Sequence, residues 1–313
     1  MKIDIVSWHD LHYGVTRELL EDALLHKGIV GVKDVPDFEK LSQRYVAAAR
    51  AFAALPESIK QKYTPARDAG RTEGYELGAE RFVNKNGDWQ IDDRKASYYA
   101  YVPDENDNVW PAEIDLKSPY LALGELIFAT GIQILNCVGV NENFGLSLNQ
   151  LTGYGRSLHY HKGGDQTNDN PDWCGGHFDH GVFTGLMPAY YFRGGEAIPE
   201  PEEAGLFVRP TNSNNYMKFE AADKSVLLFQ VGEFGQMVSN DRIKATEHRV
   251  QKANGEIERF AFALFHSASK ETRINPQSIL TADARYQDNR HEDGSLTYDQ
   301  WQIASYARYR FQK

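Results

Sequence analysis

The feature that most constrains the fold of this chain is a series of short β-like segments in its second half. They are separated by Gly, Asn, Asp and Pro and run from about residue 145 to 270. In order they are SLNQLTGYG, RSLHYH, HGVFTGL, AYYFR, GLFVRP, SVLLFQVG, EHRVQ and RFAFALFH. Many short strands with turn residues between them are typical of an all-β barrel or a double-sheet jelly roll. We therefore expect a mainly β protein with helices, built on a jelly-roll (double-stranded β-helix) core.

Helical patterns flank this region. Apolar residues recur at three- and four-residue steps over about 17–27, 37–55 and 118–140, and the tail segment 297–311 has a similar character. We expect a helical N-terminal region (1–117), a helix followed by the β core (118–270), and a helical C-terminal tail (271–313). Within the first region we expect short strands at 29–32 and 95–102. The stretch 67–87, rich in Gly and charge, predicts a loop.

Bulk properties narrow the class of partner. The chain has 313 residues and a net charge of -10, so nucleic acid and anionic membranes are not expected partners, whereas a small-molecule substrate is. The longest apolar run, 121–135, is interrupted by Glu125 and Gln133 and indicates an internal helix. The only cysteines are Cys137 and Cys174, which suggests a reducing, cytoplasmic location.

The segment GGHFDHG (175–181) carries three metal-binding side chains. In a strand, His177 and Asp179 would project from one face and His180 from the other. A third ligand is available in His248, within the strand-like KATEHRV. Two histidines and one carboxylate form the facial triad that suits non-haem Fe(II) and leaves coordination positions open. Zinc stays possible by ligand type alone.

Arg259 is a candidate anion-binding residue. In RFAFALFH, a strand would place Arg259, Ala261 and Ala263 on one face and Phe260, Phe262 and Leu264 on the other. An arginine fork matches a carboxylate, and a buried arginine needs an anionic partner. A dicarboxylate could therefore bind a metal with one end and Arg259 with the other.

A second candidate pattern lies in HYH (159–161). An HxH strand of this kind, here His159 and His161, is used for metal binding by cupins. However, no suitably placed Glu follows, and Asp165 is the nearest acid. The sequence therefore favours the His177, Asp179 and His248 set.

These residues together resemble the 2-oxoglutarate- and Fe(II)-dependent dioxygenase superfamily, in particular the group that includes isopenicillin N synthase and plant flavonoid oxygenases. The resemblance spans nearly the whole chain. It includes GEFGQMVSNDRIKATEHRV before Arg259, RSLHY around Tyr160, and the N-terminal segments ALLHKGIVGVKDVPDFEKL, FAALPESIKQKY and GYELGAERF.

The resemblance implies a set of roles. His177, Asp179 and His248 would bind Fe(II), Arg259 would pair with the distal carboxylate of 2-oxoglutarate, and Tyr160 would help to hold it. The implied reaction uses O2 to hydroxylate, desaturate or cyclise a small molecule, with release of succinate and CO2.

Two departures from the family pattern leave alternatives open. The family usually has Ser two residues after the arginine, where this chain has Ala261. This difference leaves two alternatives open. The protein could be an Fe(II) oxidase that needs no 2-oxoglutarate, or a non-catalytic jelly-roll protein that binds a metal. The polar segment 161–176 replaces the family's Pro-rich turn, and we expect it at the mouth of the site.

Overall fold

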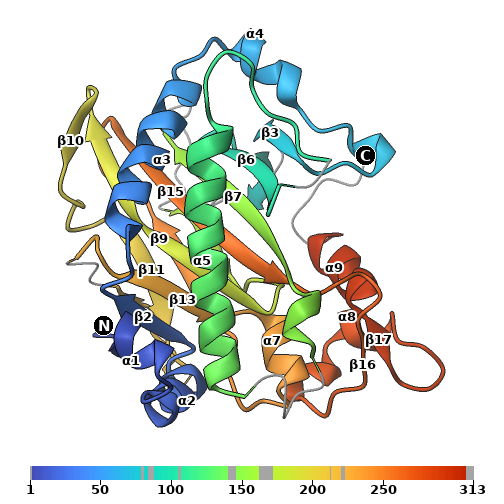
Figure 1. Ribbon diagram of the computed structural model, residues 1–313. Helices are drawn as coiled ribbons and strands as arrows, with labels where there is room; N and C mark the ends of the chain where they lie inside the picture. The colour runs from blue at the N-terminus through green and yellow to red at the C-terminus, as the bar shows by residue number, and fades with distance from the viewer. Residues whose placement is uncertain are drawn as a thin grey trace.

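The structure is a computed structural model that describes residues 2–78, 81–83, 88–104, 107–139, 146–161, 172–211, 213–219 and 223–307. Two β-sheets form the centre of the molecule (Figure 1). The larger sheet has the order β1-β2-β13-β9-β15-β7-β6-β3, with β10 added beside β9. Its strands are β1 (Ile5–Ser7), β2 (Ile29–Lys33), β13 (Leu227–Val231), β9 (Phe183–Arg193), β15 (Ile257–Ser267), β7 (Thr152–Tyr160), β6 (Lys95–Val102), β3 (Gly74–Leu77) and β10 (Glu196–Ile198).

The smaller sheet has the order β12-β11-β14-β8 and is antiparallel throughout. Its strands are β12 (Met217–Lys218), β11 (Gly205–Arg209), β14 (Glu247–Gln251) and β8 (Asp172–His177). One apolar cluster joins the two sheets, with Leu158 and Ala261 from the larger and Val208 and Val250 from the smaller. The expected jelly-roll core, two sheets enclosing a shared interior, is confirmed.

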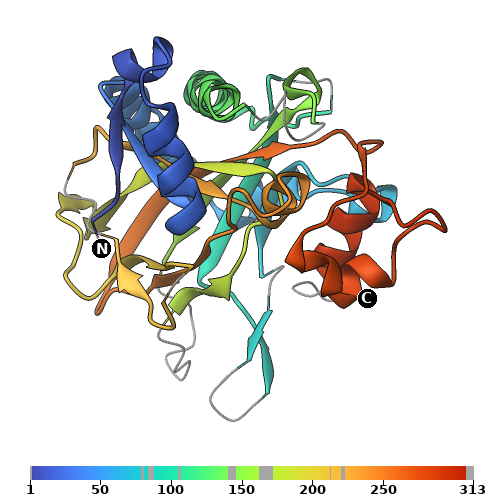
Figure 2. The ribbon, with the colours of Figure 1, turned by 90° about the horizontal axis from the view of Figure 1, so that it is seen from below.

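Helices cover the other face of the larger sheet (Figure 2). The long helix α5 (Lys117–Cys137) packs beside α3 (Phe38–Ala53), and both contact β15 and β7. By length and composition alone α5 could cross a membrane. In the fold its residues Leu123, Ile127 and Ile134 are buried against the sheet, as expected for an internal helix.

The remaining elements are short. They are α1 (Trp8–His12), α2 (Arg17–His26), α4 (Glu57–Lys60), β4 (Arg81–Val83), β5 (Trp89–Ile91), α7 (Glu233–Val238), β16 (Arg273–Ile274), α8 (Ala284–Gln287), β17 (Leu296–Thr297) and α9 (Tyr298–Ala307). The predicted helices and the strands at 29–32 and 95–102 are confirmed. The tail helix is confirmed as far as Ala307, because residues 308–313 lie outside the described part of the chain. The larger sheet takes four strands from the first predicted region, and the boundaries between the three regions stay a prediction.

Strand β15 shows why the sequence folds this way. Arg259, Ala261 and Ala263 line the interior between the sheets, while Phe260 and Leu264 pack under the helices. This alternation confirms the predicted two faces of RFAFALFH, except that Phe262, which packs against Tyr45 and Tyr120, also lines the cavity. The small alanine side chains on the inner face leave space between the sheets, and the large ones on the outer face anchor α3 and α5.

Two local predictions were wrong. The stretch 67–87 is not simply a loop, because β3 pairs with β6 and β4 pairs with β5, and this pairing outweighs the local turn composition. The segments HGVFTGL and AYYFR are not two strands but parts of the single strand β9, and SLNQLTGYG and RSLHYH likewise meet in the single strand β7. Pro188 lies where the β9–β15 register shifts, and such a bulge is where a sheet tolerates proline.

Candidate metal centre

Three predicted ligands converge at one end of the space between the sheets. His177 ends β8 and is paired in register with His248 of β14, and Asp179 follows two residues after His177. One ligand atom from each residue lies within 4.8 Å of the others, and no other group of three or more such side chains with this geometry occurs in the described part of the chain. His180 does not belong to the group, because its side chain lies against Glu233 and Tyr306. This agrees with the prediction that His180 points away from His177 and Asp179.

The position of Asp179 beside the two histidines does not come from alternation along a strand, as the sequence had suggested. Strand β8 ends at His177, so the prediction that the strand continues through 175–181 is wrong beyond that point. Instead, the first turn of α7 holds this segment, because the backbone N–H of Glu233 donates to the carbonyl oxygen of Asp179 over 2.8 Å. A side chain at Gly232 would collide with the carbonyl oxygen of Gly181, which explains the glycine just before α7.

The two distances that involve Asp179 are compatible with a shared metal ion. Oδ1 of Asp179 lies 3.7 Å from Nε2 of His177 and 3.8 Å from Nε2 of His248. Nitrogen and oxygen ligands stand about 2.0–2.2 Å from a metal such as zinc, so two ligands of one ion can be at most about 4.2 Å apart. The set of two imidazoles and one carboxylate accepts a divalent transition metal.

The charges of the three side chains depend on burial and on one another. Burial raises the pKa of Asp179, but the neighbouring histidines outweigh it and hold that pKa below its usual value. Burial and the charge of His177 lower the pKa of His248 to about 4. Burial also disfavours the charged form of His177, but Cys174 and Asp179 outweigh it and raise its pKa to about 9. A metal ion must therefore displace a proton from His177.

Gln230 is a site residue that the sequence did not single out. Its Nε2 donates to Oδ2 of Asp179 over 2.6 Å and lies 3.1 Å from Nε2 of His248. Its own Oε1 is buried and has no hydrogen-bond partner among the described residues. Gln230 is the polar residue within the apolar run VLLFQV, and this contrast could have identified it from the sequence.

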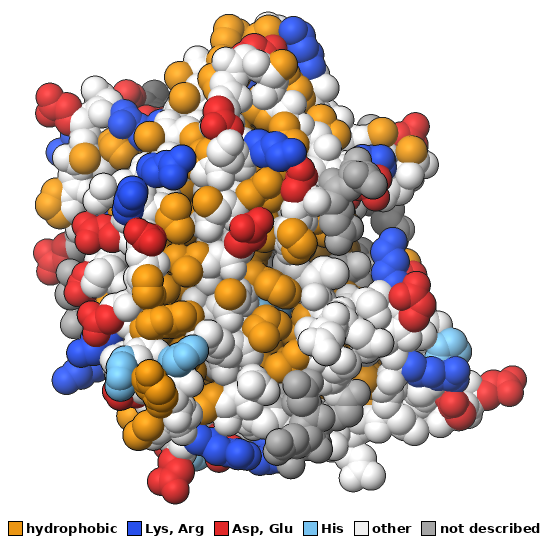
Figure 3. All heavy atoms as spheres, viewed as in Figure 1, with side chains coloured by type: hydrophobic (Ala, Val, Ile, Leu, Met, Phe, Trp, Pro, Cys, Tyr) orange, Lys and Arg blue, Asp and Glu red, His pale blue; other side chains and the backbone are white. Residues whose placement is uncertain are grey.

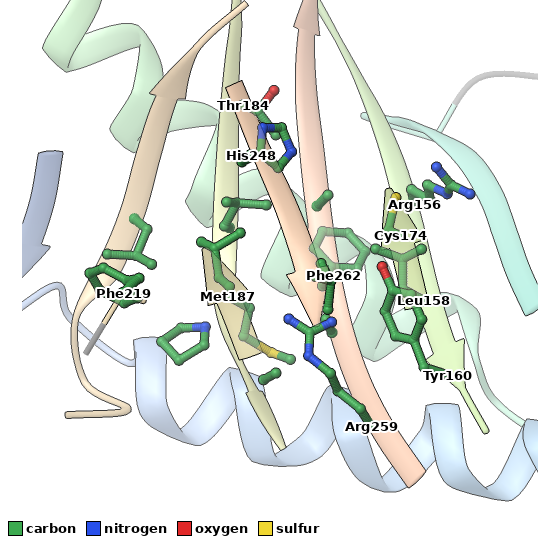
Figure 4. Close-up of a pocket in the computed structure, with 18 of the residues that line it drawn as sticks. Arg156, Leu158, Tyr160, Cys174, Thr184, Met187, Phe219, His248, Arg259 and Phe262 are labelled. Atoms are coloured by element: carbon green, nitrogen blue, oxygen red, sulfur yellow. The ribbon is translucent and has the colours of Figure 1, made fainter. Parts of the chain in front are cut away.

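The metal-binding group lies in a cavity between the sheets, of about 770 Å³ including its open mouth. The walls are mainly apolar, with Leu158, Leu186 and Phe262 among them. Figure 4 shows His248 toward one end of the cavity and Arg259 and Tyr160 toward the other.

Arg259 is buried, with only 7% of its surface exposed. Its Nε donates to the hydroxyl of Tyr191 over 3.2 Å, and its guanidinium lies 4.9 Å from the centre of the Tyr160 ring. Among the described residues no carboxylate forms a direct ion pair with this guanidinium, and Glu200 is linked to it only through the hydroxyl of Tyr191. A buried cation that faces a cavity without a carboxylate partner calls for an anionic ligand.

Tyr160 and Ala261 complete this end of the cavity. Burial raises the pKa of Tyr160 to about 12, so its hydroxyl keeps its proton and can donate. The side chain of Ala261 lines the wall beside Arg259, and its carbonyl oxygen accepts a hydrogen bond from Tyr45. The position of the family serine thus offers only a methyl group.

The other histidine pattern does not line this cavity. His159 contacts Glu258 over 2.8 Å and stacks on Phe260. Among the described residues, His159 and His161 do not form a cupin-like metal-binding group with an acidic side chain. Arg249 forms an ion pair with Asp172. Most of the segment 161–176, namely 162–171, lies outside the described residues, so its place at the mouth stays a prediction.

Comparison with known proteins adds a structural likeness. No protein-family model matches the sequence, and no curated protein matches it. Among solved structures, a full-length Neurospora crassa protein in complex with alpha-KG aligns over 98% of this chain and 96% of its own, with a TM-score of 0.72 and 19% identity. A protein of the 2OG-Fe(II) oxygenase family from Caulobacter crescentus covers 98% of both chains, with a TM-score of 0.73 and 21% identity.

A third likeness is to JOX2 in complex with 2OG, Fe and JA. It covers 97% of this chain and 84% of its own, with a TM-score of 0.67 and 18% identity. At these identities the likeness concerns the arrangement of the backbone, and it extends over nearly the full length of the chain. The chain has the fold of the 2OG-Fe(II) oxygenases.

Proposed function

We propose that this protein is an Fe(II)- and 2-oxoglutarate-dependent oxygenase that oxidises a small molecule. The observation that carries the proposal is the pairing of two features in one cavity. The His177, Asp179 and His248 group lies toward one end, and the buried cation Arg259 lies toward the other. A 2-oxo dicarboxylate has the two functional groups that such a cavity would bind.

The residues of the chain have separate tasks in this proposal. Bound iron and 2-oxoglutarate would supply the oxidising power, with O2 as the oxidant and succinate and CO2 as products. His177, Asp179 and His248 would hold the metal from one side and leave its other positions for ligands. Arg259 would bind the distal carboxylate as a fork, and Tyr160 would donate its O–H nearby. The apolar walls would limit the access of water.

A small-molecule substrate is the proposal that the charge of the chain favours. On the face seen in Figure 3, Lys and Arg side chains are interspersed with Asp and Glu, and the net charge of the chain is -10. These features disfavour a polyanionic partner. Solved relatives in fold have been crystallised with thymine, in the case of the Neurospora crassa protein, and with JA, in the case of JOX2.

One observation favours a second candidate, an Fe(II) oxidase that uses no 2-oxoglutarate. Ala261 removes a hydroxyl from the wall beside Arg259. In that case Arg259 would bind a carboxylate of the substrate itself. Succinate formation coupled to O2 uptake distinguishes the two candidates, because only the 2-oxoglutarate user releases succinate.

The test begins under anaerobic conditions with purified protein, Fe(II) and 2-oxoglutarate. We expect a weak visible absorption band from charge transfer between the metal and the chelating 2-oxo acid. The band should disappear in Asp179→Ala and persist in His180→Ala, a matched change of the neighbouring side chain that lies outside the metal group. Absence of the band in the unmodified protein would contradict the use of 2-oxoglutarate.

A further inference from the structure

Tyr191 connects Arg259 to the outer part of the cavity wall. It lies in β9 directly opposite Arg259 of β15 in the strand register, and its side chain is fully buried. Its hydroxyl oxygen accepts the 3.2 Å hydrogen bond from Nε of Arg259. The same hydroxyl donates to Oε2 of Glu200 over 3.0 Å. Arg259, Tyr191 and Glu200 therefore form a hydrogen-bonded chain.

The chain has a fixed direction. A phenol carries one hydrogen, and a carboxylate such as Glu200 can only accept, so the Tyr191 hydrogen points to Glu200. The oxygen of Tyr191 must then face Arg259 with a lone pair. Burial raises the pKa of Tyr191 well above its usual value, which keeps the hydroxyl protonated. Lys218 lies 3.3 Å from Oε1 of Glu200 and holds that carboxylate in place.

The contact with Tyr191 decides which edge of Arg259 is available. With Nε bound to Tyr191 and the guanidinium plane beside the Tyr160 ring, the two terminal nitrogens Nη1 and Nη2 remain for a ligand. A guanidinium that is already oriented loses little conformational entropy when a ligand binds. This preorganisation favours the bidentate binding of a carboxylate.

We infer that Tyr191 is a positioning residue for the cosubstrate carboxylate: it orients Arg259 so that Nη1 and Nη2 face the distal carboxylate of a 2-oxo dicarboxylic acid. Through Arg259 it compensates for the hydroxyl that Ala261 lacks. This inference rests on the proposed function, and it adds Tyr191 and Glu200 to the residues that determine cosubstrate binding.

The test is the binding of 2-oxoglutarate to protein loaded with Mn(II), measured by calorimetry without O2. Tyr191→Phe keeps the ring and removes only the hydroxyl. We expect it to weaken 2-oxoglutarate binding roughly tenfold, as for loss of a hydrogen bond to a charged group, and to leave Mn(II) affinity unchanged. Tyr190→Phe is the matched control on the opposite face of β9, and we expect no change.

A double-mutant cycle separates positioning from a general structural role. Arg259→Lys keeps the positive charge but lacks the fork that Tyr191 orients. In that background, Tyr191→Phe should change 2-oxoglutarate affinity by less than about twofold, because the two residues act as one unit. Equal losses in both backgrounds, or an unchanged affinity in the single variant, would overturn the inference while the proposed function stands. No binding by the unmodified Mn(II) protein would overturn both.

Discussion

Gln230 holds one oxygen of the Asp179 carboxylate and leaves the other for the two histidines. Its Nε2 donates to Oδ2 over 2.6 Å, whereas Oδ1 is the atom that lies 3.7 and 3.8 Å from the imidazole nitrogens of His177 and His248. The carboxylate is therefore oriented to bind a metal through Oδ1 alone. This orientation would leave more coordination positions open for the proposed cosubstrate and O2 than a bidentate carboxylate would.

Replacing Gln230 should weaken metal binding without removing a ligand. In Gln230→Leu we expect Mn(II) or Co(II) affinity to fall roughly 10- to 100-fold, the usual range for loss of a hydrogen bond to a ligand. The measurement is a metal titration followed by calorimetry. Gln133→Leu in α5 is a matched control far from the ligands in sequence and should bind normally. Unchanged affinity in Gln230→Leu would show that Asp179 needs no such support.

The difference between Gln230 and the three ligands shows how far sequence reasoning extends. His177, Asp179, His248 and Arg259 could be identified because their chemistry is unusual and because their pattern resembles that of a known family. Strand alternation alone did not place Asp179, which lies beyond the end of β8. The jelly-roll core could be predicted because the spacing of short strands and turns is a local property of the chain.

The supporting contacts could not be predicted because they arise from pairing between distant strands. Gln230 and Asp179 are 51 residues apart, and Arg259 and Tyr191 are 68 apart. Periodicity within one segment says which face a residue occupies but not which residue it meets across the sheet. The same limit explains β3, whose strand character depends on pairing with β6 rather than on its own composition.

Restoring the family hydroxyl should strengthen cosubstrate binding. Ala261 lines the cavity two residues from Arg259, so the Ser side chain in Ala261→Ser could donate to a bound carboxylate. One added hydrogen bond of about 0.5–1.5 kcal/mol corresponds to roughly two- to tenfold tighter binding of 2-oxoglutarate. Ala263→Ser, one step further along the same face of β15, is the control. Binding measured by calorimetry that tightens equally in both variants would argue against a specific role for position 261.

Stability should fall in mild acid because of His266. This imidazole is fully buried, and its two ring nitrogens face the carbonyl oxygens of Phe128 and Phe183. Burial, only partly offset by these carbonyls, lowers its pKa from 6.5 to about 4. The unfolded chain therefore binds a proton more readily than the folded one. The free energy of unfolding should decrease as the pH falls from about 6.5 to about 4, by about 3 kcal/mol from this group.

The measurement is urea unfolding at several pH values for the unmodified protein and for His266→Gln, which cannot titrate. The variant should be less stable at pH 8 but should show a shallower decline between pH 6.5 and 4. Other buried groups, His248 included, titrate in both proteins and cancel in the comparison. Parallel declines would mean that His266 does not contribute to acid sensitivity.

The C-terminal tail should stabilise the segment that carries Asp179 through one buried ion pair. Arg285 of α8 makes two hydrogen bonds, of 2.7 and 2.6 Å, to the carboxylate of Glu233 in α7, whose backbone N–H in turn holds Asp179. Removing the cation leaves the buried carboxylate of Glu233 with only His180 beside it, so Arg285→Met should lower the free energy of unfolding by about 3–5 kcal/mol. The double variant Arg285→Met with Glu233→Gln removes both charges and should recover part of that loss in denaturant unfolding. If the losses of the two single variants simply add in the double variant, the ion pair does not account for the stability.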